Sequence, residues 1–403
     1  MSSSYLRNAV VLGLLSAIGP FAIDMYLPAL PSISTDLGTT TAATQMTLMA
    51  FFIAFGLCQI VYGPVADMIG RKPPLYFGLS VFALGGIGCG LAPTVEWLIF
   101  FRFVQGIGAA AGMVIPRAII RDLHTGVEAT RLMSLVMLVF SVSPILAPLT
   151  GSGLIAAFSW RAVFVAVTIA ALLGIVLLAL LLPETRPVAA RIRSGLGSVL
   201  AGYGGLIRDL RFLGLTFIGG LGMASFFAFL ASSSFIYIDH FGLTPTEYAF
   251  AFSVNAVGFI GASQFSASLA TRFGISRVVS AAVSCYAATA VLLFVVTLAG
   301  VDSLPVLMAM LFFAFACLGL VIPSTMVLAL EEHGSIAGMA SALGGTLQFL
   351  TGALMIVVSS AFFDGTSFAM VATIVICAIG AFTLSRLTLG GRREAEAQPE
   401  PAE

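Results

Sequence analysis

The chain has 403 residues, of which 59% are hydrophobic and only 9% are charged, and its formal net charge is zero. Soluble domains carry roughly 25% charged residues, so a soluble fold would leave too much apolar surface in contact with water. Zero net charge also argues against nucleic acid as a partner. The composition therefore predicts an all-α integral membrane protein whose solvent is the lipid bilayer.

Twelve apolar segments follow one another along the chain, and each is long enough to cross a hydrocarbon core of about 30 Å as a helix. The first is read as a retained helix rather than a secretory signal, because it is too long and contains Asp24, Pro28 and Pro31. The twelve spans are expected near 6–30, 44–66, 74–92, 97–120, 132–157, 161–182, 212–238, 246–268, 277–298, 304–330, 336–360 and 366–388.

All but two of the 18 Lys and Arg residues fall at span ends or in loops on one side of the predicted membrane. By the positive-inside rule that side is the cytoplasm, and both termini are expected there. The two exceptions, Arg102 and Arg161, lie near the opposite face and need a separate explanation.

The longest interior hydrophilic stretch, 183–211, separates six spans from six. We expect an N-terminal six-helix bundle over 1–182, a cytoplasmic linker over 183–211, a C-terminal bundle over 212–390 and a disordered tail over 391–403. The two halves repeat each other: the sequence Gly112-Met-Val-Ile-Pro116 of the fourth span returns as Gly319-Leu-Val-Ile-Pro323 in the tenth. Two pseudo-symmetric halves of six spans are the arrangement of a rocker transporter.

Asp24 is the most informative residue, because it lies inside the first span, in the outer half of the bilayer. A carboxylate there costs roughly 2.5–3.5 kcal/mol on insertion scales, a penalty tolerated for function or for a partner. One reading is a carboxyl that takes and releases a proton or meets a cationic substrate group. The alternative is that Pro28 and Pro31 end the helix early and leave Asp24 in wet headgroups.

Arg102, in the fourth span, lies at a matching depth and is the expected partner of Asp24, because a buried guanidinium must be paired or hydrated. The alternative for Arg102 is that its side chain snorkels to the outer headgroups. Uncharged polar and aromatic residues inside the spans are candidates to line a substrate cavity: Tyr26, Gln45, Phe52, Gln105, Asn255 and Gln348.

The turn after the second span carries one acid and two bases in Gly63-Pro-Val-Ala-Asp67-Met-Ile-Gly70-Arg71-Lys72-Pro73. Arg71 is expected to pair with Asp122 at the inner end of the fourth span, so that Gly63, Asp67, Gly70, Arg71 and Asp122 form a conformational latch. The alternative is an ordinary positive-inside loop.

The fifth span contains Pro144, Pro148 and Gly151, which predict a bend in that helix. The bend either seals protons away from substrate or serves packing alone.

Other classes of protein find less support. The five cysteines lack C-x-x-C spacing, so no zinc site is expected. His124, His240 and His333 are scattered at span ends, without the constellation that a membrane-embedded enzyme requires. A receptor or structural bundle needs neither a buried acid nor a six-plus-six repeat.

These motifs resemble those of the major facilitator superfamily, and specifically its Bcr/CflA-type drug/proton antiporters. The resemblance covers essentially the whole chain, with its specific motifs in the first half. Three segments carry it: Asp24-Met-Tyr-Leu-Pro28-Ala-Leu-Pro31, Gly63 to Pro73, and Arg102-Phe-Val-Gln105-Gly106-Ile-Gly108. The fifth span departs slightly, with Ser143-Pro144 and Ala147-Pro148 where the antiporter motif has Gly-Pro and a later Gly.

The resemblance implies a monomeric, proton-coupled antiporter in the bacterial inner membrane that exports small amphipathic drugs such as chloramphenicol, florfenicol or bicyclomycin. Asp24 and Arg102 would couple protons to substrate, and the proton gradient would take the place of a cofactor. The alternative is a proton-coupled transporter of a natural metabolite, such as a nucleoside or sugar, on the same fold.

Overall fold

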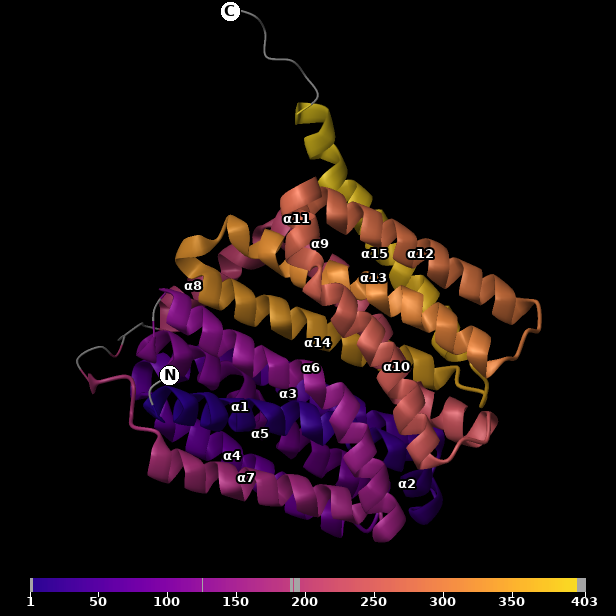
Figure 1. Cartoon of the computed structure of the whole chain (residues 1–403), viewed down its shortest axis with the longest axis horizontal. Coiled ribbons are helices and arrows are strands. Elements are labelled where there is room, and N and C mark those ends of the chain that lie inside the picture. The colour runs from indigo at the N-terminus through magenta and orange to yellow at the C-terminus, as the bar shows by residue number, and fades with distance from the viewer. Residues whose placement is uncertain (1–2, 125, 189–190, 192–195, 397–403) are drawn as a thin grey trace, which may run out of the picture. The chain divides into compact units, whose positions relative to one another are not determined.

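The computed structural model describes residues 3–124, 126–188, 191 and 196–396, and these fold as helices without a β-strand (Figure 1). Lipid offers no hydrogen-bond partner to a peptide group, so each membrane segment must satisfy its backbone within a helix. By its internal contacts the chain divides into two compact units, residues 1–200 with 230–253, and residues 201–229 with 254–403.

The first unit contains a broken first helix followed by five long ones. Its elements are α1 (Ser3–Asp24), the short η1 (Leu27–Ala29), α2 (Leu30–Asp36), α3 (Thr41–Ile69), α4 (Lys72–Leu91), α5 (Val95–Leu123), α6 (Gly126–Ala157) and α7 (Arg161–Leu181). The end of α9 (Leu210–Ser234), the π-helical turn η3 (Phe235–His240) and the start of α10 (Pro245–Gln264) also belong to this unit. Within it, α5 packs against α3 and α4, and α1 packs against α5, α6 and α7.

The second unit holds the remaining helices. It contains most of α8 (Leu196–Arg208), the start of α9, the rest of α10, α11 (Ser266–Phe273), α12 (Ile275–Leu298), α13 (Leu304–Glu331), η4 (Gly334–Ile336), α14 (Ala337–Ala361) and α15 (Phe368–Glu396). Here α12 packs against both α13 and α15.

Eleven helices of the described residues are long and apolar enough to cross a membrane, and they correspond to eleven of the twelve predicted spans. The eighth prediction, 246–268, is interrupted, because α10 ends at Gln264 and α11 begins at Ser266. α10 has 20 residues, which gives it the length of a span, but Ser253, Asn255 and Gln264 make it less apolar. With α10 counted, twelve helices of the described chain are as long as a membrane span.

The predicted boundaries at 182, 211 and 390 stay predictions. Part of the expected linker is helical, since α8 occupies 196–208, and α15 continues into the expected tail as far as Glu396. Residues 397–403 of that tail lie outside the described residues.

The repeat is visible in two aromatic contacts that occupy equivalent places. In the first unit the ring of Tyr5, at the start of α1, meets the ring of His124 after α5 edge-on, with 5.5 Å between centroids. In the second unit Phe212, at the start of α9, meets His333 after α13 in the same way, at 5.4 Å. Each half therefore joins the start of its first long helix to the end of its fourth.

Glycine sets the separation of α6 from the end of α1. A Cβ built on Gly151 would collide with the carbonyl oxygen of Met25, directly after α1. A Cβ on Gly153, two residues further along α6, would meet nothing within 4 Å. Gly151 is therefore required for the close approach of the two segments, and Gly153 is not.

We expect Gly151→Ala to destabilise the protein by about 1–3 kcal/mol, because the new methyl group forces α6 away from Met25. Gly153→Ala is the matched control, and we expect it to be neutral or to stabilise α6 by up to about 1 kcal/mol. Thermal unfolding of the detergent-solubilised variants measures both. Equal melting temperatures for the two variants would contradict this packing.

Candidate functional site

The first membrane segment is broken at Asp24, where α1 ends. The amides of Met25 and Tyr26 still bond back to Phe21 and Ile23, and η1 then begins with Pro28 at its second position. The helix therefore ends early, as one reading of the sequence proposed. Asp24 is nevertheless only 7% exposed, so protein rather than headgroup encloses the carboxyl.

The carboxylate of Asp24 faces α6, where the hydroxyl of Ser143 donates to Oδ2 at 3.4 Å. Asp24 forms no ion pair with any residue in the described part of the chain. The expected pair with Arg102 is therefore not present in this structure. Matching depth places two side chains at one level of the membrane, but the rotation of each helix decides the direction in which they point.

Arg102 lies fully buried beside the same break. Its Nη1 donates to the carbonyl oxygen of Ala22 at 3.3 Å and to Oε1 of Gln105 at 2.7 Å. The guanidinium stacks over two rings, 4.6 Å from the centroid of Tyr26 and 4.3 Å from that of Phe51, which gives it cation–π stabilisation. Arg102 thus contacts Ala22 and Tyr26 on both sides of Asp24, and its complete burial excludes snorkelling in this structure.

Two donors of Arg102, Nε and Nη2, have no hydrogen-bond partner among the described residues. A buried cation without an anionic partner is costly. These two N–H groups can therefore donate to an oxygen of a ligand, of a water molecule or of a rearranged Asp24.

Further buried hydroxyl and amide groups form hydrogen bonds within the first unit, and one of them belongs to Tyr26, directly after the break. The Tyr26 hydroxyl lies 2.7 Å from Oγ1 of Thr47, and Nε2 of Gln45 donates to the carbonyl oxygen of Ala231 at 3.0 Å and to Oγ of Ser232 at 3.3 Å. The hydroxyls of Ser233 and Tyr248 lie 3.0 Å apart. We did not single out Thr47, Ser143, Ser232, Ser233 or Tyr248 as site residues from the sequence. Three consecutive serines inside an apolar span are a signal that could have found two of them.

The six predicted cavity residues are all buried, but they do not share one unit. Tyr26, Gln45, Phe52 and Gln105 belong to the first unit, and Asn255 and Gln348 to the second. Their common role in a cavity stays a prediction.

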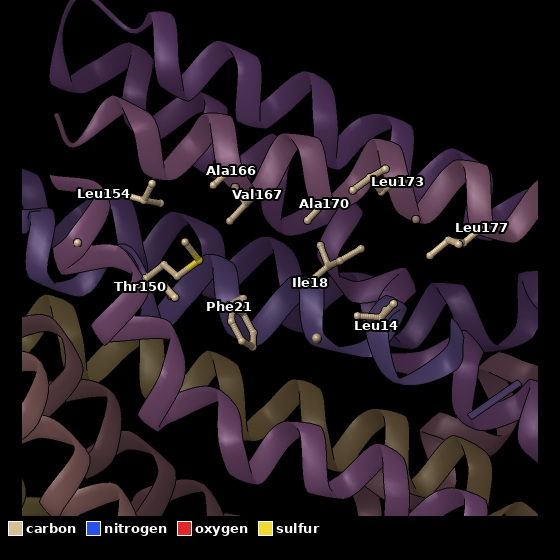
Figure 2. Close-up of a pocket in the computed structure, with 14 residues that line it drawn as sticks. Leu14, Ile18, Phe21, Thr150, Leu154, Ala166, Val167, Ala170, Leu173 and Leu177 are labelled. Carbon is tan, nitrogen blue, oxygen red and sulfur yellow. The ribbon is translucent and has the colours of Figure 1, made fainter. Parts of the chain in front are cut away.

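A pocket of about 680 Å³ in the first unit is separate from these residues (Figure 2). Its walls come from α1, α6 and α7, and it is lined by Leu14, Ala17, Ile18, Phe21, Met25, Thr150, Gly153, Leu154, Ala166, Val167, Ala170, Leu173, Gly174 and Leu177. Apart from the hydroxyl of Thr150 these side chains are apolar, so the pocket lacks the polar groups that orient a substrate.

At the other end of α3, the predicted contact between Arg71 and Asp122 is confirmed. Nε of Arg71 lies 2.7 Å from Oδ2 of Asp122, and its Nη1 lies 2.7 Å from Oδ1 of Asp67. The guanidinium thus bridges the ends of α3 and α5, and Arg71 is only 4% exposed. Two hydrogen-bonded carboxylates raise the pKa of Arg71 against the opposing effect of its burial. Gly63 lies one turn before Asp67, and a Cβ built on it would meet nothing within 4 Å outside its own helix.

Glu184, which sequence reasoning did not include in the latch, also binds at this place. Its Oε1 accepts from the backbone amide of Arg71 at 2.8 Å, and its Oε2 accepts from that of Lys72 at 3.0 Å. Partial burial favours the neutral acid, but amide donors from Arg186, Arg71 and Lys72 outweigh it and hold the pKa of Glu184 below its ordinary value.

Arg161, the second exception to the positive-inside pattern, has a structural explanation. Its Nη1 lies 2.6 Å from Oδ2 of Asp36, and the indole of Trp160 donates to the same oxygen at 2.9 Å. Arg161 therefore ties the start of α7 to the end of α2.

Pro144 and Pro148 lie inside α6, which continues through both. Ser143, Ala147 and Gly151 recur at intervals of four on the side of α6 that meets the break, where Ser143 reaches Asp24 and Gly151 reaches Met25. The residues that predict the bend therefore lie where α6 contacts the end of α1, and the bend itself stays a prediction.

The sequence and the fold of this chain are similar to those of known membrane transporters. Residues 12–356 match the model of a family described as Major Facilitator Superfamily. The chain is 36% identical over 357 residues to the "Uncharacterized MFS-type transporter YdgK" of Bacillus subtilis, with 87% of each chain covered. It is 30% identical over 387 residues to the "Bicyclomycin resistance protein homolog" of Haemophilus influenzae, with 95% and 97% covered. It is also 31% identical to "Multidrug resistance protein D" of Escherichia coli, with 84% of each covered.

Solved structures support the fold alone. The D-xylose-proton symporter has a TM-score of 0.74 and 16% identity, with 95% of this chain and 98% of that chain covered. A bacterial homologue of the human lysosomal transporter Spinster, in an inward-facing and occupied conformation, has a TM-score of 0.74, 17% identity and complete coverage of both chains.

We expect Arg71→Lys to lower the free energy of unfolding by about 1–3 kcal/mol, because one ammonium cannot reach both carboxylates with the geometry of a guanidinium. Arg161→Lys, which alters an exposed ion pair, is the control, and its cost should stay below about 1 kcal/mol. Denaturation in detergent measures both. A loss at Arg71 no larger than at Arg161 would contradict the bridging role.

The lowered pKa of Glu184 predicts a pH dependence of stability. A depressed acid pKa stabilises the fold above the ordinary value of 4.5, and this contribution is lost as the pH falls through the folded-state pKa. The melting temperature of the parent should therefore exceed that of Glu184→Gln at neutral pH, and the difference should disappear as the pH falls below 4.5. A difference that is unchanged in acid would contradict a charged Glu184.

Proposed function

Because the chain belongs to the major facilitator superfamily, we propose that it is a proton-coupled antiporter that exports small amphipathic drugs by alternating access. The observation that carries this proposal is Asp24, a buried carboxyl at a break in a membrane helix, for which the described residues supply no cation in ion-pair contact. The names of its relatives, which refer to bicyclomycin and multidrug resistance, support drugs as the substrate class. Chloramphenicol, florfenicol and bicyclomycin are the proposed representatives.

Asp24 suits the exchange of a proton for a substrate. A carboxylate that is enclosed by protein within a membrane span is stabilised by a proton or by a ligand donor. Among the described residues, Asp24 has the hydroxyl of Ser143, at 3.4 Å, as its side-chain hydrogen-bond partner. If protonation from outside and substrate binding from inside compete for this group, each favours a different conformation, and exchange results. Arg102 modulates the competition, because its free donors lie beside the break.

The latch would control the rate of exchange between conformations. Arg71 holds Asp67 and Asp122 together, and these contacts must rearrange if the ends of α3 and α5 move. We propose that both termini and this latch lie on the cytoplasmic side of the bacterial inner membrane, in keeping with the distribution of Lys and Arg.

We expect Asp24→Asn to fold normally and to lose proton-driven export, because an amide cannot exchange a proton. The measurement is drug susceptibility across an antibiotic panel in an efflux-deficient bacterium that expresses either form at equal membrane levels. The parent should confer resistance to one compound class, and the variant should confer none.

Asp36→Asn is the matched control for this experiment, because it removes a carboxylate from the same segment at an exposed ion pair. It should keep resistance near the parent level. Undiminished resistance in Asp24→Asn would exclude Asp24 as the coupling carboxyl. A parent that confers no resistance would favour the metabolite transporter, which uptake and export assays with nucleosides and sugars then test.

A further inference from the structure

The start of α4 has two backbone N–H donors, and both of them donate to a side chain from a distant part of the sequence. The first turn of an α-helix leaves its amides without intrahelical partners. In α4 that turn runs from Arg71 and Lys72 into Pro73 and Pro74, and proline has no N–H. Arg71 and Lys72 therefore carry the only amides at this helix end that need an acceptor from outside.

One carboxylate satisfies both amides. Glu184 takes the Arg71 amide on Oε1 at 2.8 Å and the Lys72 amide on Oε2 at 3.0 Å. A carboxylate at a helix N-terminus also interacts favourably with the helix dipole. Glu184 thus binds the N-terminus of α4 from a segment 113 residues further along the chain.

Gly70 provides the space for this carboxylate. Its φ of 103° lies in the region that favours glycine, and a Cβ at this position would stand 2.8 Å from Oε2 of Glu184. The conformation of the turn and the position of the carboxyl therefore depend on the same residue.

Neighbours of Glu184 hold the same place from other directions. Nζ of Lys72 donates to the carbonyl oxygen of Leu182 at 2.7 Å, and the hydroxyl of Thr185 donates to Oδ2 of Asp122 at 3.2 Å. The guanidinium of Arg186 lies 3.9 Å from Asp67 and 3.8 Å from Asp122. The segment 182–186, which leads out of α7, is therefore attached to both acids of the latch as well as to the start of α4.

We propose that Glu184 is a positioning residue of the latch: it fixes the backbone at Arg71, so that the guanidinium reaches Asp67 and Asp122 together. Through Glu184 the segment 182–186 and the latch move as one body, and displacement of this segment loosens Arg71. This inference rests on the latch of the proposed function and adds the residue that links it to the exit from α7.

Hydrogen exchange tests the contact directly. In the full chain at neutral pH in detergent, peptides that cover Gly70–Leu75 report few amides, because Pro73 and Pro74 have none. Loss of a hydrogen bond to a charged acceptor should make the amides of Arg71 and Lys72 exchange about tenfold faster in Glu184→Gln than in the parent. Peptides from α3 and α5 should exchange as in the parent.

Glu247→Gln is the matched control for this change. Glu247 also accepts a backbone amide at a helix start, that of Thr244 at 2.8 Å, but it lies at the start of α10. The Glu247→Gln substitution should leave amide hydrogen exchange at Gly70–Leu75 unchanged. Unchanged exchange in Glu184→Gln, or faster exchange throughout the first unit, would overturn the proposal.

A transport measurement separates positioning from simple capping. Glu184→Gln should lower the turnover rate about three- to tenfold with unchanged substrate affinity, and Glu184→Asp should restore part of the rate. Parent turnover combined with faster amide exchange would overturn the positioning role. If the parent exports none of the drugs tested, the proposed function fails, whereas the exchange measurement, which needs no substrate, still decides whether Glu184 holds Arg71.

Discussion

The break in the first membrane helix is the constraint on which the first unit depends. A chain in lipid must satisfy its own polar groups, yet α1 ends at Asp24 and leaves a carboxyl and the carbonyl oxygen of Ala22 to be satisfied inside the protein. The surrounding helices supply the compensation. α6 contributes Ser143 and the close approach at Gly151, and α5 contributes Arg102, which binds the carbonyl oxygen of Ala22.

The two charges at this break are not neutralised by each other. Arg102 is held by two aromatic rings, Gln105 and a carbonyl group, while Asp24 faces a single hydroxyl. A direct ion pair would satisfy both groups and leave little reason for either to bind a proton or a substrate. Their separation leaves each one able to respond to a ligand, which is the property that a coupled transporter requires.

The sequence predicted much of the fold and part of the site. Long apolar segments separated by charges are sufficient to locate helices in lipid, and the span ends brought Arg71 and Asp122 to the same side. Helix rotation is not contained in a hydropathy pattern, so the expected pair of Asp24 with Arg102 was wrong. Glu184 was missed because its bonds go to backbone amides far away in the sequence, and a side chain that binds backbone leaves no complementary charge to recognise.

If Asp24 exchanges a proton for a substrate, drug binding releases a proton from it, and this release is the most direct test. Purified protein in weakly buffered detergent is mixed with chloramphenicol or bicyclomycin, and a pH indicator records the protons released per drug bound. We expect proton release in the parent and none in Asp24→Asn. Drug binding that releases the same number of protons in both forms, or none in the parent across the pH range, would contradict it.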